Sequence, residues 1–160
     1  MELHGQERVL GLRAEPSAIN WAILSGTLEA PILEACDKEI APAAYGEADA
    51  LVWLRERTVH IIETYGPGRV AVRFPEPTAL GANKNSAKSR CRVEGVIVEA
   101  SRALALKVVT GALNTFGKRF GSGSAKQDLE KENLRGLDWS KYDRNRREAI
   151  LVAISLLPTR

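Results

Sequence analysis

The apolar positions near the start of the chain predict three adjoining strands. Residues 8–12 and 19–24 are short apolar runs separated by a turn at Pro16, a spacing typical of a β-hairpin. Residues 27–40 mix apolar and charged side chains, as expected of a third antiparallel strand with one face in solvent. Pro42 then ends this strand.

Helical spacing of apolar residues predicts two long helices in the middle of the chain. Residues 46–65 form an amphipathic pattern that stops at Gly66, and residues 86–104 form a second one. Residues 69–74 and 106–109 are short apolar runs that each follow a helix. A strand in that position usually joins the sheet in parallel, so we expect two parallel strands.

The last third of the chain predicts shorter elements around one buried helix. Residues 111–120 favour a short helix, and the Gly-Ser repeat at 121–124 indicates a flexible hinge. Residues 125–135 are charged and have helical propensity. Residues 143–157 include an almost continuous apolar run, which indicates a helix buried on most sides. The whole order indicates an α/β domain with a mixed sheet.

Composition narrows the class of protein. The chain has 160 residues, 44% of them hydrophobic, so we expect one domain, residues 8–160, behind a flexible leader, residues 1–7. Cys36 and Cys91 lack the spacing of a zinc site or a disulfide framework, which indicates a reducing compartment. No apolar run approaches the roughly 20 residues of a membrane span. We therefore expect a cytoplasmic protein that does not contact a membrane.

Four short patterns follow one another along the chain. They are residues 9–12 with 20–24, Asn83 and Ser86 ahead of a helix at Gly95, Gly121 with Ala125 and Lys126, and the run 148–153. Together they resemble the RuvC-type Holliday-junction resolvases of the ribonuclease-H-like superfamily. The resemblance covers residues 8–157. It implies an α/β ribonuclease-H-like fold whose mixed five-stranded sheet, three antiparallel strands plus two parallel, is flanked by helices. It also implies a homodimer or a subunit of a larger assembly.

The resemblance draws attention to the positions where active members of that family carry acidic metal ligands. Two divalent cations need several oxygen ligands, and an Arg side chain offers none. The matching positions here hold Arg13 on the first strand, Arg73 on the fourth, and Asn145 and Glu148 at the start of the last helix. We therefore expect no catalytic residues, no metal and no cofactor.

The two arginines have two interpretations. They can pair inside the protein with Glu148 or Glu76, or they can bind a phosphate, whose geometry the guanidinium group matches. Either way, the leading hypothesis is a RuvC-like pseudonuclease that binds nucleic acid, branched DNA or structured RNA, without cutting it. The residues expected to contact nucleic acid are Arg13, Arg73, Lys84, Lys88, Arg90, Lys118, Arg119, Lys126, Arg144 and Arg147, with Arg146 beside them.

Two alternatives stay open. The first is an active metal-dependent endonuclease that uses Mg²⁺ or Mn²⁺ at a shifted acidic site made of Glu15, Glu76 and Glu148, with Asn145. The second is a protein-interaction module that never binds nucleic acid. The net charge of +3 and the pI near 9.0 permit attraction to phosphates but do not require it.

The remaining conspicuous side chains have ordinary interpretations. His4 and His60 are isolated. Trp21, Trp53 and Trp139 are expected in the core or at an interface.

Overall fold

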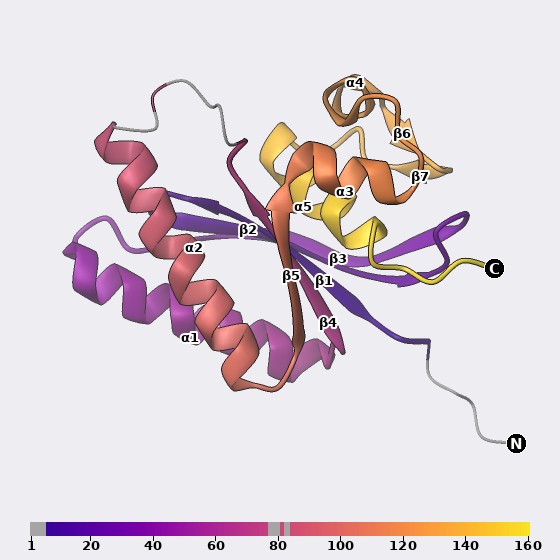
Figure 1. Ribbon diagram of the computed structural model, residues 1–160. Coiled ribbons are helices and arrows are strands. Elements are labelled where there is room, and N and C mark those ends of the chain that lie inside the picture. Colours follow the sequence, from indigo (N-terminus) through magenta and orange to yellow (C-terminus); the bar gives the residue numbers. More distant parts are fainter. Residues whose placement is uncertain (1–5, 77–80, 82–83) are drawn as a thin grey trace, which may run out of the picture.

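The computed structural model describes residues 6–76, 81 and 84–160, which form a mixed sheet with helices on both faces (Figure 1). The strand order is β3-β2-β1-β4-β5. β1 pairs antiparallel with β2, and β2 with β3, whereas β4 runs parallel to both β1 and β5. This confirms the predicted sheet of three antiparallel and two parallel strands. The strands are β1 (Val9–Glu15), β2 (Ala18–Gly26), β3 (Pro31–Ile40), β4 (Arg69–Phe74) and β5 (Lys107–Ala112).

The helices divide the core into two layers. The helices α1 (Glu47–Tyr65) and α2 (Asn85–Ala103) cover one face, where Leu10 and Val72 contribute to the apolar cluster. The helices α3 (Leu113–Arg119) and α5 (Arg144–Ile154) cover the other, over Val9 and Ala71. Consecutive strand residues thus serve opposite layers, which explains why β1 and β4 are apolar in long runs rather than in alternation. The short helix α4 (Ala125–Glu130) and the strands β6 (Asn133–Leu134) and β7 (Leu137–Asp138) complete the fold.

The glycine at position 11 sets the distance between β1 and α5. A Cβ atom built on Gly11 would lie 1.9 Å from the carbonyl oxygen of Ala149 and 2.9 Å from Cβ of Ala153. Only a residue without a side chain allows so close an approach. The contact matters for the site because Glu148 precedes Ala149 on α5, and its position is therefore fixed relative to β1.

Local hydrogen bonds explain where the elements differ from the predicted ranges. The third strand begins at Pro31 rather than residue 27, because Thr27 and Ala30 bond to each other in a turn. The predicted helical segment 125–135 ends at Glu130, and a small hairpin follows, turning at Arg135 and Gly136, both with positive φ.

The Gly-Ser stretch 121–124 makes specific contacts instead of forming an open hinge. The hydroxyl of Ser122 bonds to the Asp128 carboxylate, and Ser124 caps α4 by accepting from the N–H of Gln127. Leu134 and Leu137 of the hairpin belong to the same apolar cluster as Trp139, which is fully buried and donates its indole N–H to the carbonyl of Lys131 at 2.7 Å. Trp139 is thus a core residue, as expected.

Several expectations concern residues at the margins of the described chain. His4, Asn83 and most of the leader 1–7 lie outside the described residues. Glu7, at the end of that leader, pairs with Arg69 at 3.0 Å. Cys36 and Cys91 are free thiols. Across 6–76, 81 and 84–160, no helix has both the length and the apolar character needed to cross a bilayer.

Candidate functional site

The candidate site begins with two arginines that lie side by side at the end of the sheet. Arg13 of β1 and Arg73 of β4 are partners in the parallel register, so their side chains leave the sheet on the same face. That face carries α5, since Val9, four residues before Arg13, and Ala71, two residues before Arg73, point to the same face and pack in the α5 layer. Both arginines therefore point toward the start of α5.

Glu148 on α5 receives both guanidinium groups. Its Oε2 lies 3.0 Å from Nε of Arg13 and 3.2 Å from Nε of Arg73, while Oε1 lies 3.6 Å from Nε of Arg144. The Glu148 side chain is only 4% exposed, and those of Arg13 and Arg73 are 15% and 11% exposed. Of the two interpretations of Arg13 and Arg73, the internal pairing with Glu148 is therefore present in the structure. This pairing involves Nε of each guanidinium group, and Nη1 of Arg13 donates to the carbonyl of Ala14 at 2.8 Å.

A second pair lies beside the first and was not anticipated. Arg90 and Glu94, one turn apart on α2, place Nε and Oε2 3.4 Å apart, and the Glu94 side chain is 5% exposed. Burial raises the pKa of the Glu94 carboxyl, although the charges of Arg90 and Arg73 oppose the rise. The sequence held a signal for this: Glu94 lies in the same helical stripe as Val93, Ile97 and Ala100, where an acid needs a partner.

The guanidinium groups also influence one another. Burial lowers the pKa of Arg73, and the nearby charge of Arg13 adds to this while Glu148 opposes it. Burial likewise lowers the pKa of Arg90, together with the charges of Arg13 and Arg73. Both effects have one cause: three cations are held close together, partly out of water. The environment therefore favours an additional negative charge.

The acidic residues proposed for a shifted metal site have separate surroundings. Glu15 bonds to Lys38 and to the Asn20 amide, each at 2.7 Å, on the side of β1 that faces β2 and β3. Burial alone would raise its pKa, but hydrogen bonds from Lys38, Asn20 and Asn145 outweigh it, so the pKa is below its ordinary value. Glu76 follows β4 and lines a pocket next to Arg13. Within the part of the chain that the structure describes, no three His, Cys, Asp or Glu side chains are grouped as metal ligands.

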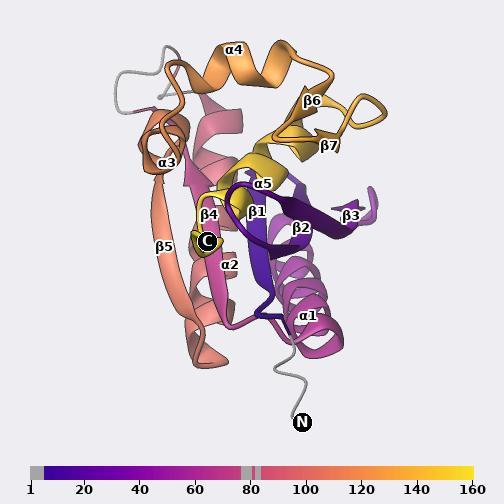
Figure 2. The same ribbon diagram turned by 90° about the vertical axis from the view of Figure 1, so that its right-hand side faces the viewer.

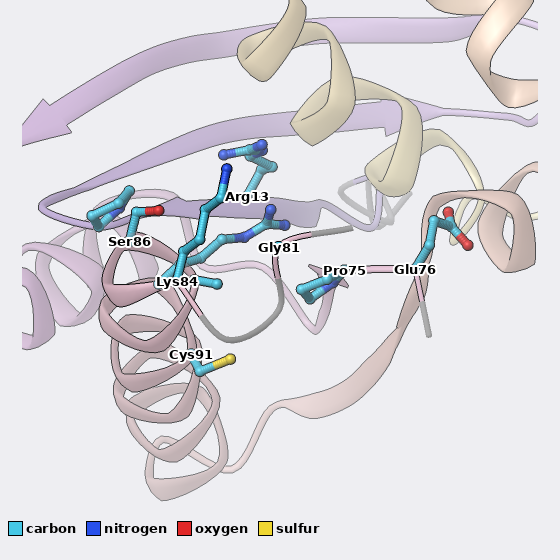
Figure 3. Close-up of a pocket in the computed structure, with 10 residues that line it drawn as sticks. Arg13, Pro75, Glu76, Gly81, Lys84, Ser86 and Cys91 are labelled. Atoms are coloured by element: carbon cyan, nitrogen blue, oxygen red, sulfur yellow. The ribbon is translucent and has the colours of Figure 1, made fainter. Parts of the chain in front are cut away.

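The remaining basic residues divide into three groups. Lys84 and Arg90 line the same pocket as Arg13 (Figure 3). The exposed residues Lys88, Lys118, Arg119 and Lys126 lie on α2, α3 and α4. Around the start of α5, the pairs are Arg144 with Glu130 and Glu148, and Arg146 with Asp143. The structure thus joins Arg13, Arg73, Lys84 and Arg90 in one site. In the part of the chain that the structure describes, no ion pair links these four residues to α3 or α4.

Arg147 has a different environment from the other basic residues at this end. Its guanidinium donates to the carbonyls of Tyr142, Leu129, Lys131 and Ser140 at 2.8–3.1 Å and lies over the Trp139 ring. These bonds tie the loop after α4 to α5. Its donors serve the fold, a role that residue types could not indicate because the four acceptors are backbone atoms.

Comparison with known proteins gives similarity in structure alone. No family model matches the chain, and no curated protein matches it in sequence. Thermus thermophilus RuvC in complex with a Holliday junction substrate superposes with a TM-score of 0.74 at 11% identity, covering 93% of this chain and 91% of that one. A second Thermus thermophilus RuvC structure gives 0.74 at 12% identity, with 92% of each chain covered.

A more distant resolvase agrees with this result. The yeast mitochondrial Holliday junction resolvase Ydc2 superposes with a TM-score of 0.58 at 12% identity, covering 96% of this chain and 79% of that one. At such low identity the likeness establishes the arrangement of the elements and leaves activity open. The chain therefore has the ribonuclease-H-like fold of RuvC, a mixed five-stranded sheet flanked by helices.

Proposed function

We propose that this protein is a RuvC-like pseudonuclease, a subunit that binds branched DNA or structured RNA without metal-dependent cleavage. The observation that carries the proposal is the position of Arg13 and Arg73, whose Nε atoms lie 3.0 and 3.2 Å from Oε2 of the buried Glu148. The fold supplies the context, since RuvC with the same fold is known in complex with a Holliday junction.

The absence of cleavage follows from the charge around Glu148. A pair of Mg²⁺ ions needs several oxygen ligands and is repelled by cations. Here two guanidinium groups occupy the surroundings of the carboxylate, and Arg144 approaches its other oxygen. Divalent cations would have to displace these groups and leave them buried without a counter-charge, which is unfavourable.

Affinity for nucleic acid is supported by the basic side chains near the same end of the sheet. β1 and β4 run in the same direction and end beside the first turns of α2, as Figure 1 shows. The helix α4 lies beyond the sheet at the end toward which β4 runs (Figure 2). Exposed Lys118, Arg119 and Lys126 on α3 and α4 can therefore contact phosphates near the strand ends.

A salt titration tests the binding. The intact protein is titrated onto labelled four-way DNA junctions and structured RNA, followed by fluorescence anisotropy from about 50 to 200 mM salt. We expect affinity to fall by at least about tenfold over that range, as several phosphate contacts require. The variant K118Q/R119Q/K126Q should bind more weakly. The matched control is R102Q/K107Q, whose residues are exposed at the other end of α2 and the start of β5.

The outcome separates the proposal from its alternatives. Junctions incubated with Mg²⁺ or Mn²⁺ should stay intact. Metal-dependent cutting that Glu148→Ala abolishes would instead establish the nuclease with a shifted site around Glu15 and Glu76. If nucleic acid binds equally at all salt concentrations, or does not bind at all, the alternative of a protein-interaction module is favoured instead. The RuvC resemblance also implies a homodimer, and sedimentation of the purified chain tests this prediction.

A further inference from the structure

A pocket opens beside the arginine cluster, between the ends of β1 and β4 and the first turns of α2. Its volume is about 350 Å³, within the range of sites that hold small molecules. Lys84, Ser86 and Cys91 line it from α2, and Arg13 lines it from β1 (Figure 3). In Figure 3 the Lys84 side chain extends toward Arg13, whereas Glu76 lies on the other side, apart from both.

The charges around this pocket do not balance. Three guanidinium groups, those of Arg13, Arg73 and Arg90, face two buried carboxylates, Glu94 and Glu148. The exposed ammonium of Lys84 and the carboxylate of Glu76 also line the pocket and offset each other, so the excess is one positive charge. Removing cations from water is costly unless a counter-charge is present. An anionic ligand would supply the missing counter-charge.

The donors around the pocket are incompletely used. Nε of Arg90 faces Oε2 of Glu94 at 3.4 Å, whereas its Nη2 is buried and has no hydrogen-bond acceptor among the described residues. Buried donors of a charged group are normally satisfied, so Nη2 indicates a missing acceptor. The start of α2 adds to the field. Its first turn contains no acidic residue, and its N-cap, Lys84, makes no capping bond through its side chain. The partial positive charge of the helix N-terminus is therefore not offset there.

The pocket also has an apolar wall. Pro16 and Pro75 contribute rings, and Ala87 and Cys91 contribute small side chains from α2. A bare inorganic anion would use the cationic side alone. A ligand that joins an anionic head to a sugar or base would use both sides, and the volume allows it.

We propose that this pocket binds a phosphomonoester, the terminal phosphate of a nucleic-acid strand or of a nucleoside monophosphate, with Arg13, Lys84 and Arg90 as its donors. This inference rests on the proposed function, because it names the part of the nucleic acid that the site recognises. A phosphomonoester carries about −1.5 to −2 charges at pH 7 and has three acceptor oxygens, one for each of these donors. An internal phosphodiester carries a single charge and has two non-bridging oxygens, so it satisfies fewer donors.

Binding of strand ends tests the proposal. Two otherwise identical single strands, one with a 5′-phosphate and one with a 5′-hydroxyl, are labelled at the 3′ end and titrated with the intact protein. The 5′-phosphate should increase affinity about tenfold, as expected of a few charge-assisted hydrogen bonds. Calorimetry with nucleoside 5′-monophosphate should show binding, and inorganic phosphate should bind more weakly because it leaves the apolar wall empty.

Two exposed lysines, Lys84 at the N-cap of α2 and Lys107 at the start of β5, provide a matched pair of variants. Lys84→Gln removes a pocket charge, and Lys107→Gln removes an exposed charge from a residue outside the pocket lining. Both side chains are in solvent, so both variants should fold. Lys84→Gln should reduce the preference for the 5′-phosphate at least threefold, and Lys107→Gln should leave it unchanged. Equal effects of the two variants would overturn the proposal.

Alkylation of Cys91 gives a second readout. This thiol is exposed and lines the pocket, whereas burial raises the pKa of Cys36 to about 12 and suppresses its reaction. Saturating nucleoside monophosphate should slow alkylation of Cys91 at least fivefold. An unchanged rate, with equal affinity for both strands, would overturn the phosphomonoester site while salt-dependent binding still upheld the proposed function. If the monophosphate binds and no polynucleotide does, the pocket stands and the proposed function falls.

Discussion

Arg13 and Arg73 lie directly beside each other on parallel strands, and Nε of each lies within 3.2 Å of the same oxygen of Glu148. Two adjacent cations repel each other, and burial strengthens the repulsion because little water screens it. The carboxylate between them makes the arrangement possible. Glu148 is therefore first of all the counter-charge of this end of the sheet.

Replacing Glu148 should destabilise the protein strongly. Glu148→Gln removes the negative charge that faces two largely buried guanidinium groups, and breaking a buried ion pair from one side costs about 3–5 kcal/mol. We expect a loss of about 3 kcal/mol in the free energy of unfolding, measured by urea denaturation. Glu99→Gln is the control, because Glu99 and Arg55 form an exposed pair with side chains 58% and 43% exposed. That change should cost less than about 1 kcal/mol, and similar losses in both variants would contradict the assignment.

Gly11 should tolerate no side chain. In Gly11→Ala the new methyl group meets the carbonyl of Ala149, so α5 must move away from β1. Overpacking of this kind costs about 1–3 kcal/mol or more. The control is Gly95→Ala on the exposed surface of α2, where nothing lies within 4 Å of the new Cβ. It should stabilise the protein by about 0.5–1 kcal/mol, and thermal unfolding of both variants compares them directly.

Arg147 should matter more for folding than for binding. Arg147→Met removes donors to four backbone carbonyls, and hydrogen bonds from a charged group contribute about 1.5–3 kcal/mol. We expect a loss of about 2 kcal/mol and faster amide exchange at Trp139 and Tyr142. Arg119→Met, at an exposed residue of α3, should change neither quantity. Unchanged stability with weaker binding of DNA would instead make Arg147 a nucleic-acid contact.

Glu15 should make part of the stability dependent on pH. Its pKa in the folded protein is lowered from the ordinary 4.5, so the unfolded chain binds its proton more readily. The stabilising contribution is then complete above about pH 4.5 and is lost as the pH falls through the lower, folded-state pKa. Lys38→Met removes a donor to Glu15. It should raise the Glu15 pKa in an NMR titration and make the loss of stability on acidification shallower, and an unchanged pKa would contradict this pairing.

The sequence predicted most of the scaffold because its signals are local. Apolar runs placed β1, β2 and β4, and helical spacing placed α1 and α2 within a few residues of their observed bounds. The hairpin of β6 and β7 escaped notice, because two-residue strands are too short to show alternation. Its turn also uses Arg135 at positive φ, a conformation that favours Gly or Asn.

The candidate site was predictable only in part. The family resemblance singled out Arg13, Arg73 and Glu148, which the fold does bring together. It could not reveal the pair of Arg90 with Glu94, because that pair becomes part of the cluster only when α2 packs beside β1 and β4. The sequence also could not show that Glu15 pairs away from this cluster, because its partner Lys38 lies on a different strand.

The close contact between Gly11 and Ala149 separates architecture from chemistry in this fold. The contact is made by Gly11, the backbone carbonyl of Ala149 and the methyl group of Ala153, none of which is charged. Side chains at the strand ends can therefore be acidic or basic without changing the distance between β1 and α5. A protein built in this way can exchange a cation site for an anion site through a handful of substitutions and still fold along the same lines.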